Sequence, residues 1–228
     1  MIKQLLIIVC LFPFVACTNN NAAKSIKETP NPIKYIKYYV RYLEAGQELQ
    51  LDAKYHNDST SIALVDGVFV GESKLNAKEF MKQGWVHRQI SRGNKPDSAY
   101  IFRYNISPTL EKQDTVYLPI YADFELATPK MSKKTGGLLA WKGKSLQQSE
   151  GLVLIFEDAE GNHFTHTHRG VTQGAQFAIR PNLIETLSKG KATLRVVHKR
   201  ETRQTTAKQQ ILKQSEYYRK AIEFEIVD

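Results

Sequence analysis

Apolar and polar residues alternate strictly along several segments of the chain after residue 33. In residues 47–56 every second residue from Leu49 to Tyr55 is apolar, and the residues between them are polar or charged. Side chains of a strand point alternately to opposite faces, so this period of two predicts a strand buried on one face. The same pattern predicts strands over residues 36–42, 100–106, 116–120, 192–196 and 222–226.

Two further segments carry other strand signals. Residues 152–156 form a continuous apolar run, which is typical of a central strand covered on both faces. Asp66 and Gly67 lie between the apolar runs 62–65 and 68–70. An Asp-Gly pair between apolar runs predicts a β-hairpin closed by a tight turn.

Helix signals are few. Residues 76–83 suit a short helix, with Asn76 as its cap and Glu79 three residues later. Residues 204–219 are a second helical candidate, although Ile211 and Leu212 are its only strongly apolar residues. Many short strands with few helices are typical of β-sandwiches. We therefore predict a mainly-β fold.

The predicted sandwich has two possible organisations. One is a single large sandwich, and the other is two tandem modules over residues 33–128 and 129–228, divided by the polar segment that follows residue 128. The order of strands in the second block, with a short turn before Lys191, resembles an immunoglobulin-like β-sandwich. Both organisations stay open at this point.

The first 17 residues have a different composition. Lys3 is followed by a largely apolar, uncharged run that ends at Ala16, next to Cys17, which is typical of an export signal. Phe14-Val15-Ala16-Cys17 is similar to the cleavage box of bacterial lipoprotein precursors. The resemblance implies a signal peptide over residues 1–16, cleavage before Cys17, and a diacylglycerol and a further acyl chain on this cysteine. The apolar run is too short for a transmembrane anchor, which needs about 20 residues.

Residues 17–32 are polar and lack periodicity, so we expect a flexible tether after the lipidated cysteine. Relatives with Asp after the cysteine stay at the inner membrane, and this chain has Thr18 there. The resemblance therefore favours the outer membrane, with the periplasmic and surface faces both open. Once Cys10 leaves with the signal, no free thiol remains, which excludes a disulfide framework, a Cys nucleophile and a thiolate metal site.

Positive charge is concentrated near the C-terminus. Residues 189–220 contain ten Lys or Arg and two Glu, a net charge of +8 (ten minus two). A basic stretch raises nucleic acid as a partner. An exported protein meets little nucleic acid, so we expect anionic lipid, lipopolysaccharide, an acidic glycan or another envelope protein instead. A solvated strand pair and loop without a partner is the favoured alternative. The predicted anionic-surface patch consists of Lys189, Lys191, Arg195, Lys199, Arg200 and Arg203.

The best candidate for metal chemistry is His166-Thr167-His168. Residues two apart on a strand point to the same face, so both imidazoles project together, and such pairs are recurring Zn or Cu ligands. A polar, solvent-facing strand is the favoured alternative. A metal site also needs a third ligand, for which the sequence offers His56, His87, His198 or Glu157.

No motif of a known catalytic site is found, whether a Gly-x-Ser-x-Gly elbow, a His-Glu-x-x-His helix or a phosphate-binding loop. We therefore predict a membrane-anchored lipoprotein, not an enzyme and without a resident cofactor, whose β modules serve binding, adhesion or envelope-complex assembly. An exported metal-binding protein that uses His166 and His168 is the first alternative, and an envelope hydrolase of unrecognised motif is the second.

Overall fold

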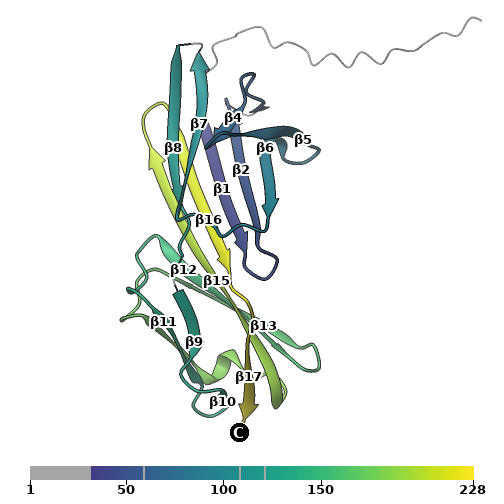
Figure 1. The fold of residues 1–228 in the computed structure, drawn as a ribbon. Coiled ribbons are helices and arrows are strands. Elements are labelled where there is room, and N and C mark those ends of the chain that lie inside the picture. Colours follow the sequence, from purple (N-terminus) through teal and green to yellow (C-terminus); the bar gives the residue numbers. More distant parts are fainter. Residues whose placement is uncertain (1–31, 59, 108, 121) are drawn as a thin grey trace, which may run out of the picture. The chain divides into compact units, whose positions relative to one another are not determined.

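The computed structural model describes residues 32–228 except 59, 108 and 121, and the described chain is almost entirely β-strand. The mainly-β prediction is confirmed, because the strands form sandwiches around two hydrophobic cores (Figure 1). The predicted signal peptide, Cys17 and the tether up to residue 31 lie outside the described residues. Within the described part of the chain, no helix has the length and hydrophobicity needed to span a membrane.

The first core is enclosed by β1 (Tyr35–Leu43), β2 (Glu48–His56), β3 (Ser61–Ile62), β4 (Val68–Val70), β5 (Ser73–Phe80), β6 (Gly84–Arg92), β7 (Ala99–Ser107), β8 (Leu110–Tyr117) and β16 (Gln210–Tyr218). One layer runs in the order β16, β1, β2, β6 and the second half of β5. The other runs from the first half of β5 through β4 and β7 to β8. β5 thus passes from one layer to the other, which joins both into one continuous sheet.

The second core is enclosed by β9 (Ala122–Leu126), β10 (Lys130–Ser132), β11 (Gly137–Lys142), β12 (Glu150–Asp158), β13 (His163–Arg169), β14 (Gln176–Ile179), β15 (Gly190–Thr205), β17 (Ile222–Val227) and the 3-10 turn η1 (Pro181–Leu183). One layer has the order β13, β12, β15, β17, β10, and the other the order β14, β11, β9.

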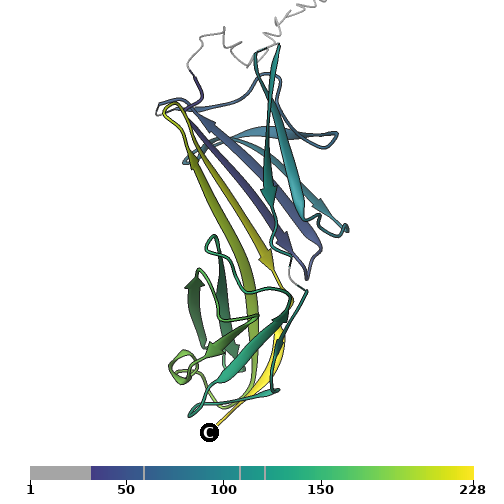
Figure 2. The same ribbon diagram turned by 90° about the vertical axis from the view of Figure 1, so that its left-hand side faces the viewer.

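β15 belongs to both sandwiches. Its first part pairs with β17 and β12, and its last part, from Val197, pairs with β16 (Figure 2). β16 comes from the C-terminal part of the chain, yet it pairs in parallel with β1 and buries Tyr217 in the first core. The two cores are therefore linked by one long strand whose partners change along its length.

The alternation in residues 47–56 produces the predicted half-buried strand. In β2, Leu51, Ala53 and Tyr55 are buried in the first core. Residues 152–156 form a central strand as predicted, since β12 pairs with β13 on one edge and with β15 on the other, but the expectation of cover on both faces is wrong. Leu152, Leu154 and Phe156 are fully buried, but the residues between them are only half-buried, so β12 is covered by a core on one face.

Both helical expectations are wrong. Residues 76–80 form the second half of β5, and residues 204–219 contain the end of β15, a turn and β16. β16 pairs with β15 on one edge and with β1 on the other, so its backbone N–H and C=O groups are hydrogen-bonded on both sides. This pairing stabilises the strand although its sequence has only a weak apolar pattern.

The Asp66-Gly67 segment makes the predicted turn but not the predicted hairpin. Gly67 has a positive φ of 86° and donates its N–H to the carbonyl of Leu64. The flanking strands do not pair with each other, because β3 pairs with β2 while β4 pairs with β5 and β7. The turn instead carries the chain from one layer of the sandwich to the other.

A buried ion pair connects the two layers of the first sandwich. Lys213 Nζ on β16 lies 2.8 Å from Asp114 Oδ1 on β8, and both side chains are almost entirely buried. The Tyr38 hydroxyl on β1 donates a hydrogen bond of 3.0 Å to the other oxygen of Asp114. All three groups are satisfied together, which is the condition for burying most of a charge pair. The pair lines a groove between β8 and the last part of β15.

Candidate functional site

The strands β15, β16, β1, β2 and β6 carry a continuous row of polar side chains on the face that points away from the first core. We call this surface the polar face. Strand alternation creates it, because residues such as Tyr39, Asp52 and Glu216 occupy the positions between those that enter the core. The sequence pattern of β1 and β2 predicts this face strand by strand, but not its continuation over β16 and β15.

Glu216 lies at the centre of the polar face. Its carboxylate accepts hydrogen bonds from the hydroxyls of Tyr39 (2.7 Å) and Tyr218 (3.0 Å) and lies 2.6 Å from Lys199 Nζ. Burial alone would raise the pKa of Glu216, but the Lys199 ammonium and the tyrosine hydroxyls outweigh it and lower the pKa below its usual value. Burial together with the Glu216 charge raises the pKa of Tyr218 to about 12, so this hydroxyl stays a donor.

A second network occupies the β2 and β6 part of the polar face. Arg88 makes a two-point contact with Asp52, with both hydrogen bonds at 2.7 Å, and Gln50 donates a third bond of 2.9 Å to the same carboxylate. Asp52 is buried, and bidentate pairs of this kind are the most strongly oriented ion pairs. Glu48 similarly lies between Arg41 and Arg92.

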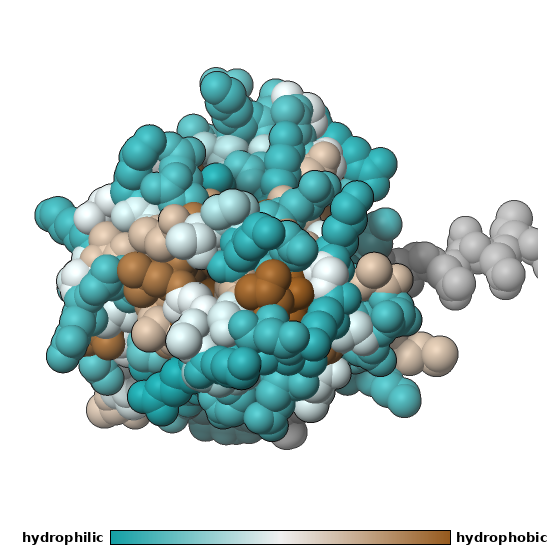
Figure 3. Space-filling view, turned by 90° about the horizontal axis from the view of Figure 1, so that it is seen from below, coloured by the Kyte–Doolittle hydropathy of each residue, from teal (hydrophilic) through white to brown (hydrophobic). Residues whose placement is uncertain are grey.

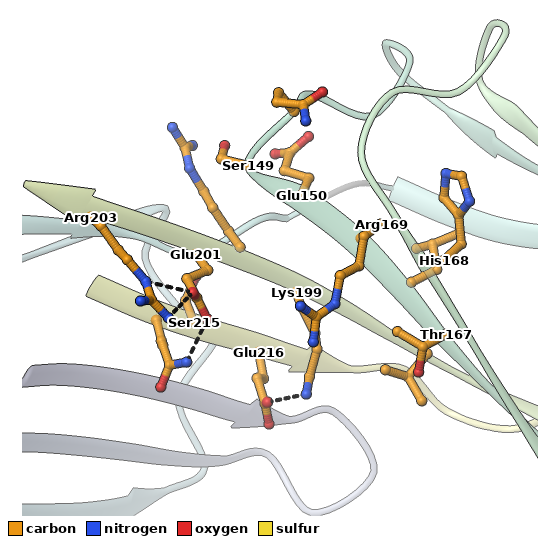
Figure 4. Close-up of a pocket in the computed structure, with 16 residues that line it drawn as sticks. Ser149, Glu150, Thr167, His168, Arg169, Lys199, Glu201, Arg203, Ser215 and Glu216 are labelled. Carbon is orange, nitrogen blue, oxygen red and sulfur yellow. Dashed lines mark hydrogen bonds and ion pairs between the residues drawn. The ribbon is translucent and has the colours of Figure 1, made fainter. Parts of the chain in front are cut away.

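Two adjoining grooves open on this surface. The central groove has a volume of about 440 Å³ and lies where β12, β13, β15 and β16 meet; Figure 4 shows Lys199 pointing toward Glu216 and Arg203 toward Glu201. The second groove, of about 360 Å³, lies over β1, β2 and β6. Gln214 and Glu216 line both grooves. The two grooves therefore form one continuous surface lined by hydrogen-bonding side chains, some positively and some negatively charged.

The predicted basic patch is distributed over two faces of β15. Lys191, Arg195, Lys199 and Arg203 share one face, whereas Arg200 points to the other, with its guanidinium 5.3 Å from the Tyr117 ring centre. Three of the six predicted residues are held by carboxylates: Lys189 by Asp228, Lys199 by Glu216 and Arg203 by Glu201. Lys199, Arg200 and Arg203 line the central groove.

His166 and His168 do share one face of β13. They are half-buried rather than solvent-facing, and their rings pack on Phe177 with centroid separations of 5.7 and 5.2 Å. The proposed third ligands do not join them, since His56 and His87 belong to the first sandwich and Glu157 opposes His163 on the other face of the strand pair. His198 is separated from His168 by Leu152 across β12. Within the described residues, no group of three or more potential metal ligands converges.

Two of the six histidines are fully buried. His87 accepts a hydrogen bond of 3.2 Å from the Leu64 N–H, and burial, with a smaller effect of Lys74, lowers its pKa to about 4. Burial, with Arg200 nearby, lowers the pKa of His198 to about 3. Both rings are therefore neutral at physiological pH. In the sequence, His198 continues the alternation of the apolar residues predicted as a strand over 192–196, whereas no strand is predicted around His87.

The turn between β12 and β13 is closed by Asp158. Its carboxylate accepts hydrogen bonds from the backbone N–H groups of Ser188, Asn162 and Glu160 and from the Asn162 side chain. These bonds, that of Ser188 first, lower the pKa of Asp158 to about 2. Asp158 therefore stabilises the turn and holds the backbone at Ser188 next to it.

The end of the second sandwich, where β17 terminates, presents a mostly hydrophilic surface in which small hydrophobic areas lie among residues of intermediate hydropathy (Figure 3). Association surfaces usually show a contiguous apolar patch. The polar face differs from this end in having grooves lined by oriented charged groups, which makes it the better candidate for a site that binds a polar ligand.

No family model matches the chain, and no curated protein matches it in sequence.

Proposed function

We propose that the protein is a membrane-anchored bacterial lipoprotein whose β-sandwiches bind a polar ligand of the cell envelope without catalysing a reaction. The observation that carries the binding proposal is the polar face, with two grooves that share Gln214 and Glu216. Its charged groups are held in place by partners before a ligand arrives. Such preorganisation reduces the entropy cost of binding and favours specific recognition.

An extended envelope glycan is the ligand class that this surface suits best. The polar face crosses five strands, which at about 4.8 Å per strand spacing gives a width of about 19 Å. It offers hydroxyl, amide, ammonium, guanidinium and carboxylate groups along one track. Because the positive charges of Lys199 and Arg203 are already paired, we favour a glycan over a purely electrostatic contact with an anionic membrane.

The anchor is tested by Cys17→Ala. We expect this variant to stay unprocessed or to move from the membrane to the soluble fraction, because the thioether to the lipid can no longer form. Cell fractionation and the mass of the purified chain measure both effects. Cys10→Ala is the matched control, since Cys10 leaves with the signal and its loss should change neither result. Normal processing and membrane retention of Cys17→Ala would refute the anchor.

The binding surface is tested by Gln214→Ala. Gln214 lines both grooves, so its loss should weaken glycan binding about fivefold, the effect of the roughly 1 kcal/mol contributed by one neutral hydrogen bond to the ligand. The full chain in detergent is first screened against an array of envelope polysaccharides and peptidoglycan fragments, and the affinity for the best ligand is then compared between variants. Gln176→Ala, an exposed change on β14, is the control. If Gln214→Ala and Gln176→Ala bind the ligand with equal affinity, the polar face is not the binding site.

A further inference from the structure

A separate pocket lies at one open edge of the second sandwich, between β13 and β14 and beside η1. It has a volume of about 380 Å³ and is lined by His166, His168, Phe177, Arg180, Asn182 and Leu183. β13 and β14 are terminal strands of their layers, so the pocket opens where the two layers end. Phe177 and Leu183 provide the apolar part of the lining, and the two imidazoles pack on the Phe177 ring.

The polar groups of this pocket are suited to donate hydrogen bonds. Nε2 of His168 is buried and has no hydrogen-bond partner within the described part of the chain. Leaving such a group unsatisfied destabilises a folded protein, so an orphan nitrogen beside a cavity points to a missing partner. Arg180 is exposed at the pocket and forms no ion pair with a described residue. Among the described residues that line the pocket, none is Asp or Glu.

This composition argues against a metal ion. A divalent cation needs at least a third ligand, and the other polar side chains of the lining are the neutral amide of Asn182 and the guanidinium of Arg180, which repels a cation. The same guanidinium attracts an anion and presents two parallel N–H donors that fit a planar carboxylate. One positive side chain matches one negative charge, and the apolar wall accommodates the carbon atoms next to it.

We propose that this pocket binds a carboxylate group of a ligand, held by Arg180 and by the ring nitrogens of His166 and His168. The carboxylate can belong to a uronic acid of a glycan or to the C-terminus of a peptide. The site is independent of the lipid anchor and of Gln214. His168 lines both this pocket and the central groove. Arg180 and His166 line this pocket but not the central groove.

Nuclear magnetic resonance of the full chain in detergent, with labelled histidine and arginine side chains, tests the proposal. The probes are glucuronate, N-acetyl-alanine, neutral glucose and Zn²⁺. We expect at least one carboxylate to shift the ring signals of His166 and His168 in a saturable way, while glucose does not. Saturation by glucuronate alone assigns the site to a glycan, saturation by N-acetyl-alanine alone assigns it to a peptide end, and saturation by both supports a general carboxylate site.

Variants complete the test. Arg180→Gln should weaken carboxylate binding about tenfold or more, the effect expected for one charged hydrogen-bond donor. Arg195→Gln, an exposed change on β15, and His163→Ala, on the opposite face of β13, should leave the affinity unchanged. The proposal is overturned if neither carboxylate saturates the site, or if Zn²⁺ binds one-to-one and the double change His166→Ala and His168→Ala abolishes that binding. Gln214→Ala should not alter carboxylate binding, so this site and the polar face can fail separately.

Discussion

Acidification from pH 7.5 to pH 4.5 should lower the free energy of unfolding by about 5 kcal/mol, because two histidines are buried in their neutral form. His87 and His198 have no exposed surface, and burial lowers their pKa values to about 4 and about 3. In the unfolded chain both imidazoles titrate near the reference value of about 6.5. The unfolded state therefore takes up more protons than the folded state throughout this interval.

The direction and the size of the pH effect on stability follow from this difference in proton uptake. Each depressed pKa contributes stability that is fully present above pH 6.5 and is lost as the pH falls toward the folded value. At pH 4.5 the protonation of each histidine in the unfolded chain lowers the free energy of unfolding by about 2.5 kcal/mol. This value follows from the difference between the unfolded and folded pKa values at that pH. Since domains are stable by only about 5–15 kcal/mol, a loss of this size brings the chain close to unfolding.

Urea unfolding of the full chain in detergent at pH 7.5 and pH 4.5 measures the effect. The double variant His87→Gln and His198→Gln removes both titrating groups, so its stability should depend much less on pH, even if it is lower at pH 7.5. His163→Gln replaces an exposed histidine and should keep the pH dependence of the parent protein. A double variant with an undiminished pH dependence would show that other groups control acid unfolding.

Replacement of Lys213 by Met should destabilise the first sandwich by about 3–5 kcal/mol, the usual cost of leaving one member of a buried ion pair alone. Asp114 and Lys213 have side chains exposed by only 11% and 12%, with their charged atoms 2.8 Å apart. Without the ammonium, the Asp114 carboxylate keeps the Tyr38 hydroxyl as its one partner among the described residues and stays largely buried beside the groove that both charged residues line.

A double-mutant cycle separates this cost from lost packing. Asp114→Asn combined with Lys213→Met removes both charges, so it should recover most of the stability that the single Lys213→Met change loses. Lys112→Met, an exposed change on the same strand as Asp114, should alter stability by less than about 0.5 kcal/mol. A loss below about 1 kcal/mol for Lys213→Met, measured by urea unfolding at pH 7.5, would mean that water reaches the pair.

Candidate sites were predictable from the sequence only where they depend on strand alternation. The alternation correctly places His166 and His168 on one face of β13, because that relation involves two residues of one strand. It cannot show that Phe177 covers them or that Arg180 lies beside them, since these residues come from β14 and the segment that follows it. The sequence left the third metal ligand open, and among the described residues no group of three or more potential metal ligands converges.

The basic stretch of residues 189–220 illustrates the same limit. Its net charge of +8 counts only carboxylates inside the segment. In the folded chain Lys189, Lys213 and Arg219 are paired with Asp228, Asp114 and Glu44, all of which lie outside it. Charge counted along the sequence overestimates the free positive charge, because strand pairing brings acids from distant segments to the same surface.

By itself, the sequence determined the mainly-β fold and the inward or outward direction of residues in strands such as β1 and β2. Both depend on a local period of two, which every strand must obey whatever its partner. The parallel pairing of β1 with β16, the passage of β5 between layers and the sharing of β15 by two cores were decided only by the tertiary structure. The physical reason is that a backbone hydrogen bond has the same chemistry in any strand pair. The choice of partner and register therefore depends on packing between segments far apart in the chain.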